Sequence, residues 1–154
     1  MALKFHPEPG TILVCDFSGL REPEMTKTRP VVVISPRLKR RNDLVAIVPL
    51  STTAPKTVMR YQCQLNLSPP LPRPFDSPSM WVKGDMIYTV GFHRLDLVRT
   101  ERDHTGRRKY LTRRIPDEEL KRIRHCVLVG LGWLDDALID KMSGTTICKA
   151  PALP

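Results

Sequence analysis

The chain has 154 residues, which is enough for one domain with a substantial core but not for two. Its 25 lysine and arginine residues outnumber 16 aspartate and glutamate residues, and the net charge of +9 favours a polyanionic partner, nucleic acid before a membrane surface. The 4 cysteines form no C-x-x-C pair and no tight Cys/His spacing, so we expect no zinc site. We also expect no other metal and no cofactor.

Short apolar runs rich in β-branched residues predict three strands early in the chain, over Thr11–Phe17, Thr28–Ser35 and Leu44–Thr53. If the second and third strands pair antiparallel, the start of one lies beside the end of the other. The polar residues at these two strand ends would then meet at one rim of the sheet.

Arg29 begins the second of these strands, and Ser51, Thr52 and Thr53 end the third. A guanidinium group offers a planar fork of donors that matches phosphate oxygens, and hydroxyl groups can add further hydrogen bonds. The pattern therefore predicts a phosphate-binding or phosphate-cleaving corner.

A fourth strand is predicted over Val58–Leu65, where apolar and polar residues alternate. The proline-rich segment Leu67–Ser79 reads as a stiffened loop, because proline fixes φ and cannot donate to a strand ladder. Ser79–Lys83 and Asp85–Val90 predict one strand that is bent or bulged at Gly84.

A basic hairpin is predicted where Leu95–Glu101 and Arg107–Thr112 flank a turn at Asp103–Gly106. The first convincing helix begins near Pro116–Glu119, because proline suits an opening position and acidic residues suit the positive end of the helix dipole. We expect Gly130 and Gly132 to end this helix.

Six or seven short strands followed by one or two helices predict a mainly β fold with a C-terminal helix, a small and strongly bent SH3-like barrel. A short second helix is expected over 134–142, so that residues 1–142 form a single domain. Residues 143–154 are expected to be a flexible or loosely packed tail.

The start of the chain, residues 1–9, is polar and proline-rich and does not resemble a signal peptide. The longest apolar run, Cys126–Leu134, is too short to span a bilayer, so we expect no membrane partner. Cys15 and Cys126 lie in apolar segments and are expected to be buried thiols. Together these features favour a cytoplasmic protein.

Four segments occur in the order typical of a known family. They are Gly10–Phe17 for "G-x-I-x-x-V-D-F", Glu24–Ser35 for "E-x-x-x-x-R-P-V-V-V-x-S", Val48–Thr52 for "V-P-x-T-[ST]" and Lys83–Thr89 at the place of a strand ending in "D-Q-x-R-T". Over roughly residues 9–125 the chain resembles the MazF/PemK toxins of bacterial toxin–antitoxin systems.

The resemblance implies a homodimeric SH3-like barrel that cleaves single-stranded RNA at specific sequences without a metal. The 2′ hydroxyl would attack the adjacent phosphate and leave a 2′,3′-cyclic phosphate and a 5′ hydroxyl. Arg29 would stabilise the developing charge, Ser51 and Thr52 would hold phosphate oxygens, and Asp85 would be the general base. A cognate antitoxin would bind the same cationic groove, and DNA would be bound only through the antitoxin complex.

Further residues are expected to contact the substrate, because they lie near this corner or in the basic segments. They are Glu24, Thr28, Lys83, Tyr88, Arg40 and Arg41. The arginines of the predicted hairpin would also follow an RNA backbone and make binding sensitive to salt. We expect Trp81 to lie in the core and His93 to be structural.

Each assignment has a structural alternative. Arg29 could form an exposed ion pair with Glu22 or Glu24, and the hydroxyl groups could serve local turns. Asp85 could close a turn after Gly84. Lys83 and the other charged side chains could form a solvated face.

Two further functions also fit the sequence. Tyr88 stands where the family pattern has an arginine, and Lys83 where many members carry another arginine. These differences favour a catalytically impaired module of the same fold that binds nucleic acid or protein. The other further function is that of a phosphate-binding adaptor with no role in RNA chemistry.

Overall fold

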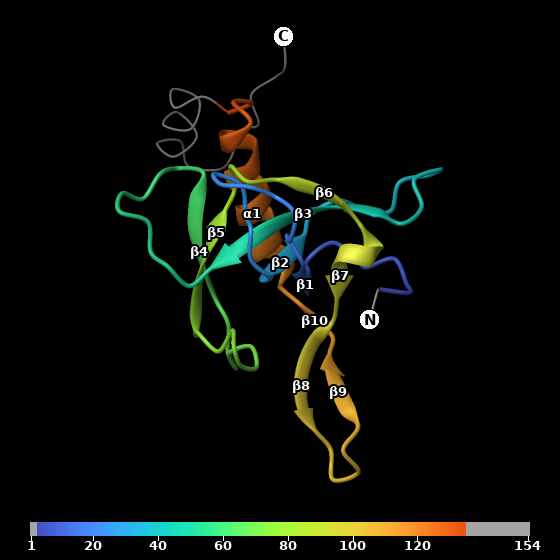
Figure 1. Cartoon of the computed structure of the whole chain (residues 1–154). Helices are drawn as coiled ribbons and strands as arrows, with labels where there is room; N and C mark the ends of the chain where they lie inside the picture. The colour runs from blue at the N-terminus through green and yellow to red at the C-terminus, as the bar shows by residue number, and fades with distance from the viewer. Residues whose placement is uncertain (1–2, 135–154) are drawn as a thin grey trace.

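The computed structural model describes residues 3–134 as a curled antiparallel sheet, a two-stranded hairpin and one C-terminal helix (Figure 1). In chain order the elements are β1 (Thr11–Cys15), β2 (Arg29–Val33), β3 (Leu44–Ser51), β4 (Gln62–Asn66), β5 (Ser79–Lys83), β6 (Tyr88–Gly91), the 3₁₀ turn η1 (Phe92–Arg94), β7 (Leu95–Asp96), β8 (Val98–Arg102), β9 (Arg108–Leu111), β10 (Arg113–Arg114) and α1 (Asp117–Gly130). The predicted fold class, mainly β with a C-terminal helix, is confirmed. The predicted tail over 143–154, and the predicted second helix apart from its first residue, lie outside the described residues.

Strand β3 is the centre of the sheet, with β2 on one edge and both β6 and β5 on the other. On the second edge Ile47 lies opposite Tyr88, and Leu50 lies opposite Val82. Residues 84–87 interrupt this pairing and shift its register. The predicted bent strand is therefore confirmed as two strands that follow one another along β3.

An apolar cluster covers each face of the sheet. The cluster on the helix side includes Ile12, Val32, Val48, Leu50, Met80, Val82, Ile123 and Val127. The cluster on the opposite side includes Leu13, Cys15, Phe17, Val31, Val33, Ile47 and Leu95. Because both faces are covered, β2 and the second half of β3 are apolar at nearly every position instead of alternating.

Helix α1 packs against one face of the sheet, with Leu120, Ile123 and Val127 buried (Figure 1). Its first turn carries acidic residues, which suit the positive end of the helix dipole, as predicted. Arg124 donates from Nε and Nη2 to the Ile34 carbonyl at 3.1 and 2.8 Å. No helix within residues 3–134 is long and apolar enough to cross a membrane.

The fourth strand begins later than its alternating pattern predicts. Residues 58–61 form an exposed connection that ends in a tight turn, because the Gln62 amide donates to the Met59 carbonyl and the Met59 amide donates to Gln62 Oε1. The predicted basic hairpin is confirmed as β8 and β9, and it projects away from the sheet (Figure 1).

Candidate functional site

Arg29 and Ser51 lie at the same rim of the sheet, as the strand pattern predicts. Val31 of β2 lies opposite Pro49 of β3. Arg29 begins β2 and Ser51 ends β3, so each is two residues beyond this pair toward the rim. Opposed residues of an antiparallel pair point to the same face, so both side chains belong to the face opposite α1.

Arg29 carries a guanidinium group that no described residue neutralises. Its Nε atom is buried without a hydrogen-bond partner, and no ion pair within residues 3–134 includes it. The other half-buried arginines donate to main-chain carbonyls: Arg94 to Asp16 and Ser18, Arg113 to Ser68 and Pro69, and Arg124 to Ile34. The alternative ion pair with Glu22 or Glu24 is absent from the described part of the chain, so the Arg29 donors remain available for an anion.

Arg29 and Ser51 begin a row of opposed side chains, here called the Arg29 row, which continues across the sheet onto β5 and β4. Ser51 lies opposite Trp81, and Trp81 lies opposite Gln64. Trp81 is only partly buried and belongs to neither apolar cluster, although Met80 and Val82 beside it are fully buried. The expectation that Trp81 is a core residue is therefore wrong, because the strand alternation turns it to the open face.

Ser51 is buried, and its Oγ accepts a hydrogen bond from the Thr53 amide at 3.2 Å. This contact is the local turn bond that the structural alternative predicts, and it leaves the hydroxyl proton of Ser51 available as a donor. Thr52 and Thr28 each lie one residue beyond the row, and both are exposed. The rim therefore places two further hydroxyl groups next to the Arg29 row.

Lys83 lies two residues after Trp81 on β5, opposite Gln62, and is half-buried. Since side chains alternate along a strand, Lys83 points to the same face as Trp81. It adds a second positive charge to the face that carries the Arg29 guanidinium.

Asp85 lies apart from the Arg29 row. It follows β5 in the turn before β6, and its side chain is exposed. The turn packs against the end of α1, because a Cβ on Gly130 would meet the Gly84 carbonyl at 2.9 Å and the Asp85 Cα at 3.0 Å. No hydrogen bond or ion pair within residues 3–134 joins Asp85 to Arg29 or Ser51.

Tyr88 and Glu24 are both engaged in the structure of the loop between β1 and β2. The Tyr88 ring packs against Phe17 with ring centroids 4.9 Å apart, and its hydroxyl accepts a hydrogen bond from the Met25 amide at 2.9 Å. Glu24 accepts a hydrogen bond from the Arg21 amide at 3.1 Å and is exposed. Tyr88 therefore anchors the loop that leads to Arg29. Its hydroxyl is already engaged and is not free to take the place of the arginine in the family pattern.

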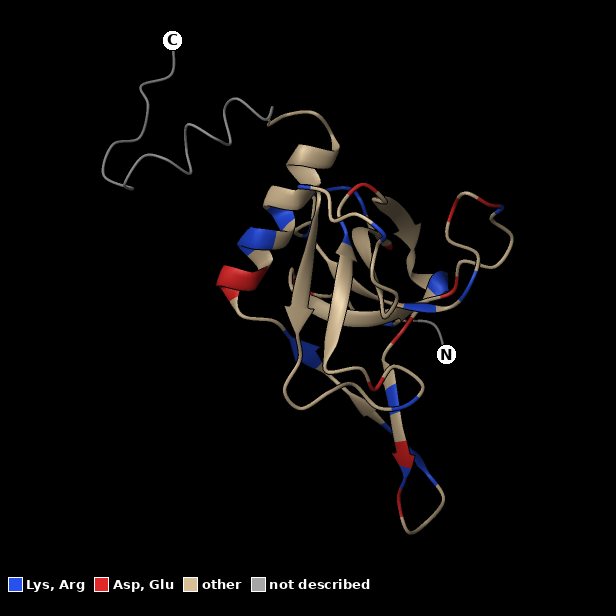
Figure 2. Ribbon diagram, turned by 90° about the vertical axis from the view of Figure 1, so that its left-hand side faces the viewer, with Lys and Arg blue, Asp and Glu red and all other residues tan. Residues whose placement is uncertain are grey.

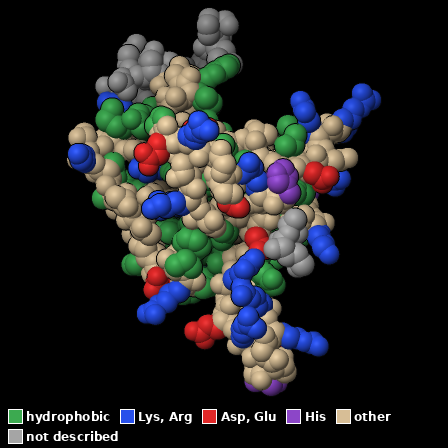
Figure 3. Space-filling view, viewed as in Figure 1, with side chains coloured by type: hydrophobic (Ala, Val, Ile, Leu, Met, Phe, Trp, Pro, Cys, Tyr) green, Lys and Arg blue, Asp and Glu red, His purple; other side chains and the backbone are tan. Residues whose placement is uncertain are grey.

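Arg40 and Arg41 lie in the exposed loop between β2 and β3, at the opposite end of these strands from Arg29. Figure 2 shows further basic positions along the β8–β9 hairpin. In the space-filling view, Lys and Arg side chains extend from the β2–β3 loop and from the β8–β9 hairpin (Figure 3). The structure thus brings Arg29, Ser51, Thr52, Thr28 and Lys83 to one region and places these basic segments at its periphery.

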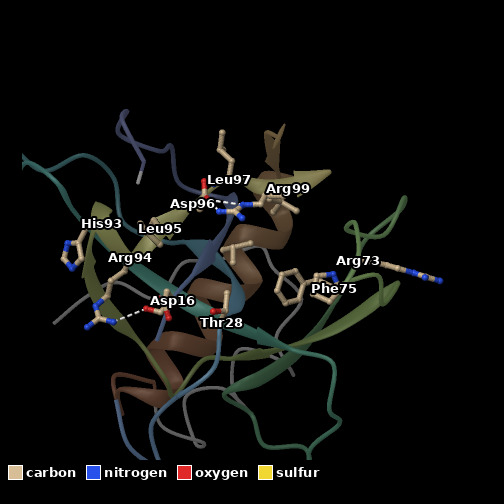
Figure 4. A pocket seen from close by; sticks show the side chains of 13 residues that line it. Asp16, Thr28, Arg73, Phe75, His93, Arg94, Leu95, Asp96, Leu97 and Arg99 are labelled. Carbon is tan, nitrogen blue, oxygen red and sulfur yellow. Dashed lines mark hydrogen bonds and ion pairs between the residues drawn. The ribbon is translucent and has the colours of Figure 1, made fainter. Parts of the chain in front are cut away.

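A cavity of about 570 Å³ lies beside the rim, between the β1 and β7 strands and the proline-rich loop (Figure 4). Thr28, Asp16 and Phe75 contribute to its lining. The arginines around it already have partners: Arg94 donates to the Asp16 and Ser18 carbonyls, Arg99 contacts Asp96 at 2.9 Å, and Arg73 contacts Asp76 at 3.4 Å. Their hydrogen-bond donors are therefore engaged, in contrast to those of Arg29. His93 also lines it and is exposed, with its ring against Gly91.

No group of three or more metal-ligating side chains occurs within residues 3–134. Cys15, Cys63 and Cys126 are free thiols, and the first and last of these are buried, as predicted. Burial raises the pKa of Cys15 to about 12. A hydrogen bond from the Cys126 thiol lowers the pKa of Cys63, and the same contact raises that of Cys126.

The chain matches the family model described as "PemK-like, MazF-like toxin of type II toxin-antitoxin system" over residues 8–129. The uncharacterised protein YifN of Escherichia coli (strain K12) is 28% identical over 147 residues, which cover 83% of this chain and 93% of that protein.

Solved structures give the same picture of the fold. MazF from Deinococcus radiodurans has a TM-score of 0.54 at 18% identity and covers 84% of this chain and 99% of that chain. The MazE–MazF complex of the same organism gives a TM-score of 0.50 at 18% identity and covers 84% of this chain and 98% of that chain. The predicted small, curled β-barrel is confirmed by the likeness to the first of these structures.

Proposed function

Because the chain belongs to the PemK-like, MazF-like toxin family, as its motifs predict, we propose that it is a metal-independent, sequence-specific endoribonuclease acting on single-stranded RNA. The observation that carries this proposal is the guanidinium of Arg29, which has no partner among residues 3–134 and lies beside the Ser51 hydroxyl. A cation that the described residues leave unneutralised, beside hydroxyl donors, is suited to a phosphate group.

The proposed reaction is an internal transfer at one phosphate. The 2′ oxygen of the RNA loses its proton to a base and bonds to the phosphorus, and the bond to the 5′ oxygen of the next nucleotide breaks. The leaving 5′ oxygen takes a proton from water, and the base later returns its proton to water, so the products are a 2′,3′-cyclic phosphate and a 5′ hydroxyl. Negative charge grows on the phosphate oxygens, so Arg29 stabilises the transition state, and Ser51 and Thr52 donate to the same oxygens.

The general base is a separate part of the proposal. The family pattern gives this role to Asp85, and an ionised carboxylate is a suitable proton acceptor. Asp85 lies in the turn after Lys83, away from the Arg29 row. The role of Asp85 as general base and the role of Arg29 in stabilising the transition state are therefore tested by separate variants.

The proposed partners follow from the charge of the chain and from its family. The net charge of +9 suits RNA and an antitoxin with an acidic segment. The MazE–MazF complex of Deinococcus radiodurans is a toxin–antitoxin pair with this fold. We propose that the present chain likewise binds an antitoxin and reaches DNA only through it. As its family resemblance implies, the proposal also includes a homodimer in the cytoplasm. Arg40, Arg41 and the hairpin would guide the RNA backbone from the periphery.

A second candidate function is supported by Tyr88. Its hydroxyl and ring are used inside the protein, where the family pattern has an arginine. A module that binds RNA through Arg29 and Lys83 without cleaving it would retain the same fold.

Cleavage of a long single-stranded RNA in EDTA tests the proposal. We expect discrete fragments that carry 5′ hydroxyl ends, which a kinase labels without prior phosphatase treatment. The matched Arg29→Ala protein should yield none. RNA that is bound but left intact by the wild-type protein would reject the enzyme and favour the binding module.

A further inference from the structure

We propose that the open face of β4 and β5 is a base-stacking subsite, where the Trp81 indole receives one unpaired base of single-stranded RNA. The base belongs to a nucleotide next to the phosphate that Arg29 holds. The subsite rests on the proposed function in one respect only, namely that the phosphate held by Arg29 is the one at which the RNA is cleaved.

The strand register places the indole beside the Arg29 phosphate corner. Trp81 lies directly opposite Ser51. Ser51 and Arg29 are each two residues beyond the Val31–Pro49 pair of β2 and β3, so they lie opposite one another. Neighbouring strands are about 4.8 Å apart, so Arg29 and Trp81 start about 10 Å apart at the backbone, on the same face. This separation is comparable to that between a phosphate and the base of an adjoining nucleotide.

The side chains around Trp81 are polar and are matched to a nucleic acid. Ser79 and Lys83 flank it along β5, and their partners on β4 are Asn66 and Gln62. Amide side chains can pair with the edges of a base, and the Lys83 ammonium can meet a following phosphate.

The surroundings favour RNA over an apolar protein surface as the occupant. The other outward positions of these two strands are glutamine, asparagine, serine and lysine, so Trp81 is a single aromatic ring in a polar face. A docking protein requires a contiguous apolar patch, whereas a base of single-stranded nucleic acid stacks on one accessible ring beside positive charge.

The platform is held in place before any ligand arrives. β4 and β5 are paired along their whole lengths. Arg122 of α1 donates to the Gln64 carbonyl at 3.2 Å, which ties β4 to the helix. At the end of β5, Gly84 lies against α1 and the start of β4 so closely that a Cβ there would clash with the Tyr61 carbonyl and with Cys126. A preformed ring loses little conformational entropy on binding.

Tryptophan fluorescence tests the subsite directly, because the chain has only 2 tryptophans. A Trp133→Phe protein leaves Trp81 as the reporter, and a Trp81→Phe protein leaves the exposed Trp133 as the matched control. The probe is a mixed-sequence single-stranded RNA with 2′-O-methyl groups, which cannot undergo the internal transfer. We expect saturable quenching of Trp81 by this RNA and no change of Trp133.

Affinity for the same probe gives an independent readout. Trp81→Ala should weaken binding about ten- to a hundredfold, and Trp81→Phe should recover most of the loss, because either ring can stack on a base. Trp81→Leu keeps apolar bulk without a ring face and should behave like the alanine protein.

The outcomes separate this subsite from the proposed enzyme. Quenching of Trp81 in a protein that cleaves no RNA would reject the enzyme and retain the subsite. RNA that binds, by fluorescence anisotropy, without changing Trp81 emission would overturn the subsite, even in a protein that cleaves. Unaltered affinity of the Trp81→Ala protein would overturn it as well.

Discussion

Arg29, the first residue of β2, lies across from Ser51, the last residue of β3, at the rim of the sheet. The arginine has a buried Nε atom without a partner in the described part of the chain, and the serine has a buried hydroxyl that accepts one hydrogen bond. This relationship gives the candidate site its positive charge and its nearest donor.

Ser51→Ala should lower kcat/KM about tenfold, because the phosphate loses one hydroxyl donor. It should also lower the free energy of unfolding by about 1 kcal/mol, since the Thr53 amide loses its acceptor. Ser51→Thr is the matched variant and keeps the hydroxyl group. Cleavage assays and chemical denaturation measure both effects, and equal activity loss in the two variants would exclude the hydroxyl from catalysis.

Asp85→Asn tests the general base. If Asp85 accepts the proton of the 2′ hydroxyl, the amide should lower kcat about a hundredfold or more, because it cannot accept this proton. RNA affinity should change little, because Asp85 lies outside the Arg29 row. The measurement is single-turnover cleavage beside an affinity titration. Retained cleavage would remove Asp85 from the mechanism and leave the roles of Arg29 and Ser51 intact.

Tyr88→Phe should lower the free energy of unfolding by about 1 kcal/mol, because the Met25 amide loses the hydroxyl that it donates to. The packing of the ring against Phe17 is retained in this variant. Chemical denaturation of the wild-type and variant proteins measures the difference. A Tyr88→Phe protein that is as stable as the wild type but binds RNA more weakly would show that the hydroxyl serves substrate instead.

Cys63 should be alkylated by iodoacetamide at lower pH than an ordinary thiol, because the Cys126 hydrogen bond lowers its pKa and the thiolate is the reacting form. The rate should rise with pH and reach half its limit below the value of a free cysteine. Cys15 should stay unmodified near pH 8, since burial raises its pKa to about 12. Peptide mass mapping assigns each site.

Cys126→Ala is the control for this pH dependence. It removes the hydrogen-bond donor, so the pH midpoint of Cys63 alkylation should move upward. An unchanged midpoint would show that the contact between the two thiols does not control Cys63.

Much of the candidate site follows from local patterns. The apolar runs around Arg29 and Ser51 predict two strands, and antiparallel pairing alone brings their ends together. The helix at Pro116 follows from its proline, its acidic first turn and its apolar stripe. These features depend on residues close together in the chain.

The features that sequence reasoning missed depend on long-range packing. The alternation of Met80, Trp81 and Val82 shows that the indole faces away from its neighbours, but not that its face is open, because the second apolar cluster covers that face over β1–β3 and does not extend to β4 and β5. The bond from Met25 to Tyr88 joins residues 63 apart in the chain. At Val58, a turn fixed by Gln62 and Met59 overrides an alternating pattern.

The central claim is that the Arg29 guanidinium stabilises the phosphate during cleavage. The most direct measurement is the single-turnover cleavage rate of the Arg29→Ala protein on an RNA that the wild type cleaves. Lys121→Ala is the matched control, because it removes one positive charge from an exposed site on α1. We predict a fall of about a hundred- to a thousandfold for Arg29→Ala and no more than about a twofold change for the control. Equal rates for the wild-type and Arg29→Ala proteins would contradict the account.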